Sequence, residues 1–204
     1  MILRPDEASV LEVYRALIEV VTPRPIAWVT TVDRQGRVNL APFSFFNAFG
    51  ANPPVVVFSP TLRRDGTKKD TLLNVEATGE FVLNAAVAPL AEAVNQTSAE
   101  VPPGRSEAEL AGLALAPSER VAPPRVAASP AHLECRLVQV VPVGGGPLSA
   151  NLVIGEVVLV HIDDSVLDAS GHVDPRKLGT IARLGGEYYC RTSDLFTMKR
   201  PTAP

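Results

Sequence analysis

The sequence predicts a mainly β protein with short helices, in which the strands form a barrel. Apolar runs of strand length at residues 24–32, 55–59 and 80–85 are separated by turn and helix signals. Two longer runs, residues 131–143 and 149–163, flank a glycine-rich turn and carry apolar side chains on both faces. Burial on both faces is expected for a barrel wall that is covered by helices or by a partner subunit.

Length, composition and charge exclude several classes of protein. With 204 residues and 46% hydrophobic residues, the chain has the size of one compact domain, which we expect to span residues 1–204. A net charge of −3 without a basic block argues against binding to nucleic acid or to a membrane surface. No apolar run approaches a membrane span, and the charged N-terminus does not resemble a signal peptide, so we expect a cytoplasmic protein. Two cysteines without a CxxC pair and three histidines without ligand spacing predict free thiols and no metal site.

The N-terminal part of the chain predicts a helix followed by a β-hairpin. Apolar residues recur at helical spacing over residues 8–19, and Ser9 is a plausible N-cap. Residues 24–32 form the first strand, turn at Asp-Arg-Gln-Gly and pair with residues 37–41. Because proline lacks the N–H that a sheet ladder uses, we expect Pro42 to interrupt the second strand.

Residues 43–49 combine four phenylalanines with polar side chains. Such dense aromatic residues usually belong to a core, which is the simpler interpretation of the phenylalanines. Ser44 and Asn47 are more informative, because they fall just past a strand end, where hydrogen-bond donors can face a planar heterocycle. The continuous apolar run at residues 55–59 then predicts a central strand.

Residues 60–71 are the best candidate for an anion site. They hold four cations and three threonines and precede or open a helix that runs to about Ala77 and ends at Gly79. Free N–H groups and the positive helix end favour an anion there, and phosphate is the obvious candidate, although the spacing is not that of a P-loop. The sequence equally allows a solvated loop in which Thr67 or Asp70 only caps the helix.

The middle of the chain is rich in proline. After the strand at residues 80–85 and a short helix at 89–96, residues 98–130 contain six prolines around one amphipathic segment. A segment of this length without strands suggests a lid or a dimer-contacting excursion. A disordered linker is the alternative, but the leucine cluster of this segment needs a surface to bury against.

The C-terminal part of the chain predicts two long strands and then a tight turn. His161 falls on an apolar strand face, where a packed, hydrogen-bonded histidine is more common than a catalyst. Gly185 and Gly186 permit a tight turn that would present Arg183 and Tyr188 together, although an ordinary surface loop would have the same spacing.

Several catalytic signatures are missing from the sequence. It has no G-x-S-x-G elbow, no H-E-x-x-H pair and no G-x-G-x-x-G between a strand and a helix. The sequence therefore lacks the motifs that a hydrolase, a zinc enzyme or a Rossmann oxidoreductase of these types would need. A cofactor that carries the chemistry itself would reconcile a polar, aromatic, phosphate-ready site with the lack of an acid–base pair.

One pattern spans nearly the whole chain. Its segments are TPRPIAWVTT at 22–31, NLAPFSFFN at 39–47, KDTLLN at 69–74, GEFVLN at 79–84, LAGL at 110–113, LEC at 133–135, LVIGEV at 152–157 and RLGGEY at 183–188. In order and spacing they resemble the flavin reductase-like family of FMN-binding split barrels. That family includes reductases, flavoredoxin-like carriers and uncharacterised members.

The resemblance implies a six-stranded antiparallel split barrel of Greek-key type that forms a homodimer with FMN near the interface. The residues that would line the isoalloxazine are Trp28, Val29, Thr30, Thr31, Ser44, Phe45, Phe46 and Asn47. Those that would hold the ribityl chain and phosphate are Ser59, Thr61, Arg63, Lys68, Asp70 and Thr71. Arg183 and Tyr188 would lie near the open face of the flavin.

The resemblance also implies an FMN-dependent oxidoreductase, in which hydride passes from NADH or NADPH to flavin N5 and electrons pass on to free flavin or a small acceptor. Asn151 stands where several reductase relatives carry a histidine. This difference favours an alternative, a non-enzymatic flavoredoxin-like electron carrier or a binder of FMN or aromatic ligands. A scaffold without a ligand is a third interpretation.

Overall fold

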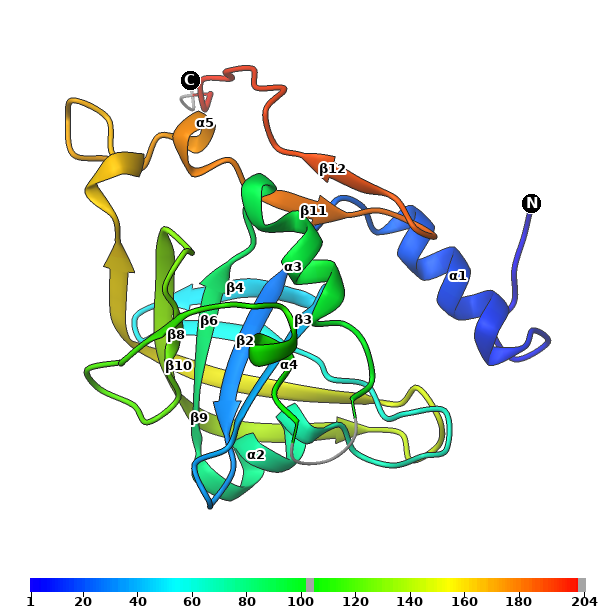
Figure 1. The fold of residues 1–204 in the computed structure, drawn as a ribbon. Helices are drawn as coiled ribbons and strands as arrows, with labels where there is room; N and C mark the ends of the chain where they lie inside the picture. Colours follow the sequence, from blue (N-terminus) through cyan, green and yellow to red (C-terminus); the bar gives the residue numbers. More distant parts are fainter. Residues whose placement is uncertain (102–104, 202–204) are drawn as a thin grey trace.

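The structure, a computed structural model, describes residues 1–101 and 105–201 and is built on a seven-stranded antiparallel sheet (Figure 1). In sheet order, the strands are β3 (Val38–Phe43), β2 (Ala27–Val32), β6 (Glu80–Ala85), β9 (Ala131–Val143), β10 (Ala150–Ile162), β5 (Pro54–Phe58) and β4 (Phe46–Ala51). The prediction of a mainly β fold with short helices is confirmed. The sheet has seven strands where the resemblance implies six.

Short helices and two small sheets surround the main sheet. The helices are α1 (Val10–Val20), α2 (Asp70–Thr78), α3 (Ala91–Gln96), α4 (Glu107–Leu110) and α5 (Pro175–Leu178), with 3-10 turns at Ala88–Leu90 and Asp164–Val166. One small sheet contains β1 (Arg24–Pro25), β11 (Ile181–Arg183) and β12 (Tyr189–Arg191), and the other contains β7 (Leu115–Ala116) and β8 (Arg125–Val126). Within the described ranges, none of these helices has the length and apolarity that a membrane crossing needs.

Two apolar clusters, one on each face of the sheet, form the core. In the first, the Phe58 ring packs between Phe43 and Phe81, with ring centroids 5.5 and 5.3 Å apart. In the second, the fully buried Trp28 donates a hydrogen bond from its indole N–H to Thr97 Oγ1 at 2.8 Å. All residues of β2 are buried, so the prediction of a strand covered on both faces is confirmed.

Strand β10 crosses the aromatic cluster at a glycine. A Cβ atom on Gly155 would lie 2.3 Å from Cζ of Phe81, whose ring is completely buried. The register of β10 against β9 also shifts between Ile154 and Gly155. The close approach of the β10 backbone to the Phe81 ring therefore requires a residue without a side chain.

Two strand predictions need correction. Strand β3 continues past Pro42 to Phe43, and Pro42 lies opposite Trp28 of β2. Because β3 is an edge strand, a proline can face its free side without loss of a ladder hydrogen bond. The sequence predicts no strand in the aromatic stretch that follows, but Phe46–Ala51 forms β4 and pairs with β5.

Several local predictions are confirmed. Ser9 caps α1 in a capping box with Glu12, and Gly79 ends α2 with a φ of +73°. Both cysteines are free thiols, Cys135 buried and Cys190 partly exposed.

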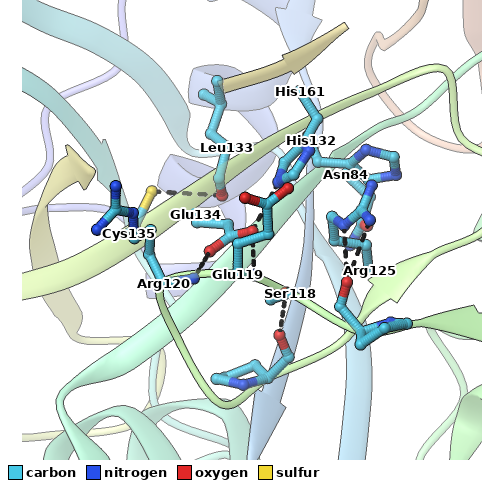
Figure 2. A network of polar contacts seen from close by, with 12 residues as sticks. Asn84, Ser118, Glu119, Arg120, Arg125, His132, Leu133, Glu134, Cys135 and His161 are labelled. Atoms are coloured by element: carbon cyan, nitrogen blue, oxygen red, sulfur yellow. Dashed lines mark hydrogen bonds and ion pairs between the residues drawn. The ribbon is translucent and has the colours of Figure 1, made fainter. Parts of the chain in front are cut away.

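Residues 105–130 are held against the sheet by polar side chains that bind their backbone (Figure 2). The completely buried carboxylate of Glu134 accepts hydrogen bonds from the N–H groups of Glu119 at 2.9 Å and Arg120 at 2.6 Å. It also binds His161 Nε2 at 2.6 Å, so the prediction of a hydrogen-bonded, packed histidine is confirmed. Burial alone would raise the pKa of Glu134, but these three partners outweigh it and hold that pKa below its usual value.

The same segment is tied to the sheet at other points. Asn84 on β6 accepts from the N–H of Val126 at 2.8 Å, and His132 on β9 donates to the Val126 carbonyl at 2.9 Å. In the opposite direction, Glu107 on α4 accepts from the N–H of Leu40 at 3.0 Å, and burial raises the pKa of Glu107. The prediction that residues 98–130 contain no strand is wrong, because β7 and β8 pair there. Residues 102–104 of this segment lie outside the described residues, and its role as a lid or dimer contact stays a prediction.

Helix α1 leaves most of its apolar side chains uncovered by its own chain. Figure 1 shows it standing off the main sheet, beside the β11–β12 hairpin. Only Ile18 of this helix is buried, whereas Leu17 and Val20 are 50% and 79% exposed. The buried guanidinium of Arg24 holds the helix end by donating to the carbonyls of Ile18 and Val21.

Candidate functional site

A cavity of about 170 Å³ lies between the edge strand β3, the connection from β5 to α2, the first turn of α2 and residues 97–101, which follow α3. We call it the anion cavity, because two cationic side chains, Arg63 and Lys69, line it together with the Thr71 hydroxyl. Its walls also carry acidic groups. Asp70 pairs with Arg63 at 3.1 Å, and Glu107 is already bound to the β3 backbone. Glu100 also lines the cavity.

The start of α2 is open to a ligand. Its N-cap residue is Lys69, and no side chain caps the helix. Thr67 donates its hydroxyl proton to Asp65 at 2.6 Å, and Asp70 is engaged with Arg63. The alternative in which Thr67 or Asp70 caps the helix is therefore wrong. The first N–H groups of a helix have no acceptor within it, so this helix end can bind an anion.

The two lysines before α2 have different surroundings. Lys68, which the resemblance selects for the phosphate, forms an ion pair with Glu76 at 2.7 Å. Lys69 instead lines the anion cavity, with its Nζ 5.5 Å from the centroid of the Phe43 ring. Burial, and then the positive charge of Arg63, lower the pKa of Lys69, and the negative charge of Glu100 offsets part of this shift. A bound anion would relieve the repulsion between these two cations.

The predicted ribityl and phosphate residues divide into two groups. Three of them, Arg63, Asp70 and Thr71, come together in the anion cavity, whereas Ser59, Thr61 and Lys68 are not among its lining residues. The Ser59 hydroxyl accepts from the N–H of Asn151 at 3.2 Å, and the Asn151 amide donates to the Pro60 carbonyl at 3.2 Å. These contacts fix the end of β5 and leave Asn151 buried.

The four residues on β2 that are predicted to line the flavin ring are buried within the protein. Trp28, Val29, Thr30 and Thr31 are all fully buried. The hydroxyl of Thr30 accepts from the Asn84 amide at 2.7 Å. The contact of these four side chains with a flavin ring stays a prediction.

The predicted ring residues after β3 point to different neighbours. Ser44 Oγ accepts from Arg24 Nε at 3.3 Å, and the Phe45 ring packs edge-on to Tyr14 with centroids 6.4 Å apart. Phe46 lines a second, apolar cavity of about 390 Å³ at the end of the sheet. This second cavity is also lined by Pro23, Pro25, Ala27, Leu83, Leu133 and Ile181. Asn47 is exposed and accepts a hydrogen bond from the N–H of the next residue.

At the Gly185–Gly186 turn, the structure places Arg183 beside Tyr189. The Arg183 guanidinium lies 4.4 Å from the centroid of the Tyr189 ring and donates to the Gly186 carbonyl at 3.0 Å. Tyr188 is 74% exposed. A position of Arg183 and Tyr188 near a flavin face stays a prediction.

Most lining residues of the anion cavity were not chosen from the sequence, Asn39 and Lys69 among them. Lys69 directly precedes Asp70, so its position as the N-cap was the available signal. Asn39 had no local signal, because it meets Thr71 only through the fold.

Comparisons with known proteins agree with this fold. The family model "Flavin reductase like domain" matches residues 21–180. Nitrilotriacetate monooxygenase component B from Bacillus cereus is 34% identical with a TM-score of 0.91, covering 97% of this chain and 98% of its own. The 2-nitrobenzoate 2-nitroreductase NbaA from Pseudomonas fluorescens is 30% identical with a TM-score of 0.88, covering 99% and 97%. A split-barrel protein from Shewanella frigidimarina, 24% identical, matches with a TM-score of 0.84 over 98% of this chain and 100% of its own.

Proposed function

Because the chain belongs to the flavin reductase-like family, we propose that it is a flavin-dependent oxidoreductase that binds FMN and uses NADH or NADPH as hydride donor. The anion cavity carries this proposal, since it offers cations, a hydroxyl and a free helix start to a phosphate group. The nitroreductase activity named for one similar structure supports redox chemistry in this family. We also propose a cytoplasmic location, which cell fractionation would test.

The residues of the cavity fit a phosphate monoester. Arg63 and Lys69 would neutralise its charge, and the first N–H groups of α2 would donate to its oxygens. FMN, when bound, supplies the hydride-accepting and electron-transferring chemistry. The protein then needs to bind and orient this group and to restrict the access of water, rather than to provide an acid–base pair.

Spectroscopy of the purified protein tests this function. Protein loaded with FMN should be yellow, and its visible absorbance should bleach when NADH or NADPH is added without oxygen. A colourless protein that does not bind added FMN would contradict the proposal as a whole. Bleaching by dithionite but not by either nicotinamide would contradict the choice of hydride donor.

An electron carrier is the second candidate function. Asn151 favours it, because its amide is buried and bound to the Pro60 carbonyl rather than free to contact a nicotinamide. In stopped-flow experiments, a carrier would be reduced quickly by a reduced electron-transfer protein and slowly by NADH or NADPH. The opposite order of rates would exclude this candidate.

We further propose that two copies of the chain associate through α1, with FMN near the interface. An eleven-residue helix is marginally stable alone, and this one buries a single residue against its own chain. Replacing Leu17 with Asp should shift the protein from dimer to monomer in sedimentation, because a charge would enter the apolar contact. The same change at the exposed Arg15 of this helix is the control. A wild-type monomer would refute the association.

A further inference from the structure

The hydroxyl of Thr71 has a fixed acceptor role toward the protein. Asn39 Nδ2 donates to Thr71 Oγ1 at 2.9 Å and to Thr31 Oγ1 at 3.3 Å, so both amide hydrogens of Asn39 are used. Thr31 Oγ1 receives a second hydrogen bond from Asn74 Nδ2 at 3.0 Å. Two asparagine amides thus hold the hydroxyl oxygens of Thr31 and Thr71, and of these two threonines Thr71 lines the anion cavity.

This arrangement leaves the hydroxyl proton of Thr71 available. A hydroxyl that accepts a hydrogen bond through its oxygen still has one proton to donate. Thr78, on the same helix, donates its proton to the Asn74 carbonyl at 2.9 Å. Among the described residues, the Thr71 hydroxyl has no such acceptor, although its side chain is almost completely buried and lines the cavity.

We infer that Asn39 is a positioning residue that orients the Thr71 hydroxyl so that it donates to the phosphate of FMN. This inference rests on the proposed function. Asn39 acts through Thr71. The hydrogen bond from its side-chain amide to Thr71 Oγ1 prevents the hydroxyl from turning its proton toward β3. The hydroxyl then adds a neutral donor to the charges of Arg63 and Lys69, at a fixed place on the cavity wall.

The test compares FMN with riboflavin, which has the same ring and ribityl chain but no phosphate. Thr71→Val should lower FMN affinity by about tenfold and leave riboflavin affinity unchanged, because it removes a hydrogen bond to a charged group. Asn39→Leu, which keeps the size of the side chain but cannot donate, should lower FMN affinity by roughly three- to tenfold, again without effect on riboflavin. Thr71→Ser, which keeps the hydroxyl, should restore most of the FMN preference.

A double-mutant cycle separates positioning from general support of the fold. If Asn39 acts through Thr71, Asn39→Leu in the Thr71→Val background should cause no further loss of FMN affinity. Additive losses, or an equal loss of FMN and riboflavin affinity, would overturn the inference while leaving flavin binding intact. A wild-type protein that binds neither FMN nor riboflavin would overturn the inference and the proposed function together. Should Asn39→Leu fail to fold, Asn39→Ser in the same cycle serves the same comparison.

Discussion

Replacing Lys69 with methionine should weaken FMN binding by roughly 10- to 100-fold, because a hydrogen bond to a charged group contributes about 1.5–3 kcal/mol. Methionine keeps an unbranched apolar side chain and removes the ammonium group, which lines the cavity 5.5 Å from the centroid of the Phe43 ring. Riboflavin affinity should remain close to that of the wild type, since this ligand lacks a phosphate. The dissociation constants follow from titration of flavin fluorescence.

The neighbouring lysine provides a matched control. Lys68→Met removes the same charge one residue earlier, but its ammonium group binds Glu76 and does not line the cavity. FMN affinity should change by less than about threefold, as expected for a surface ion pair. Equal effects of the two substitutions would mean that FMN responds only to the overall electrostatic field of the protein. The assignment of Lys69 to the phosphate site would then be wrong.

Replacing Gly155 with alanine should destabilise the fold by about 1–3 kcal/mol, the usual cost of overpacking a core. The added methyl group would lie 2.3 Å from Cζ of Phe81, a buried ring that packs against Phe58 and has little room to move. For a protein of this size, the midpoint of thermal unfolding should fall by roughly 3–10 °C. Differential scanning calorimetry of the wild type and the variant measures this shift.

Gly145 offers a control for the intrinsic effect of a glycine-to-alanine change. A Cβ atom there would meet no atom within 4 Å, so Gly145→Ala should leave the unfolding midpoint almost unchanged. In the double variant Gly155→Ala, Phe81→Leu, the smaller side chain at position 81 should recover part of the stability lost in Gly155→Ala, because the two substitutions act on one contact. Strictly additive losses would show that the clash with Phe81 is not the cause.

The elements that could be predicted from the sequence are those with a local signal. Helix α2 ends at Gly79, which takes the left-handed conformation, and β2 follows from an apolar run that is buried on both faces. Strand β4 could not be predicted, because five of its six residues are exposed and only pairing with β5 makes it a strand. The prediction that Pro42 interrupts its strand was wrong for a related reason. Its position on an edge strand is a property of the sheet and not of the sequence around it.

The candidate site could be predicted to the segment but not to the side chain. A cluster of cations before α2 indicated an anion site, yet the choice between Lys68 and Lys69 depends on the residue at which the helix begins. The contact between Asn39 and Thr71 joins residues 32 positions apart, so it exists only once β3 and α2 are packed together. Buried β2 residues such as Thr30 were chosen by resemblance, and the structure shows their hydroxyls engaged within the protein.

Glu134 and Asn84 accept hydrogen bonds from main-chain N–H groups of the segment that covers the sheet, at Glu119, Arg120 and Val126. Side chains at such positions can be exchanged without weakening those bonds, as long as the replacement is not proline. The outward-facing side chains of this segment can therefore be substituted during evolution while the barrel beneath stays the same. New recognition properties could arise there at little cost to the fold.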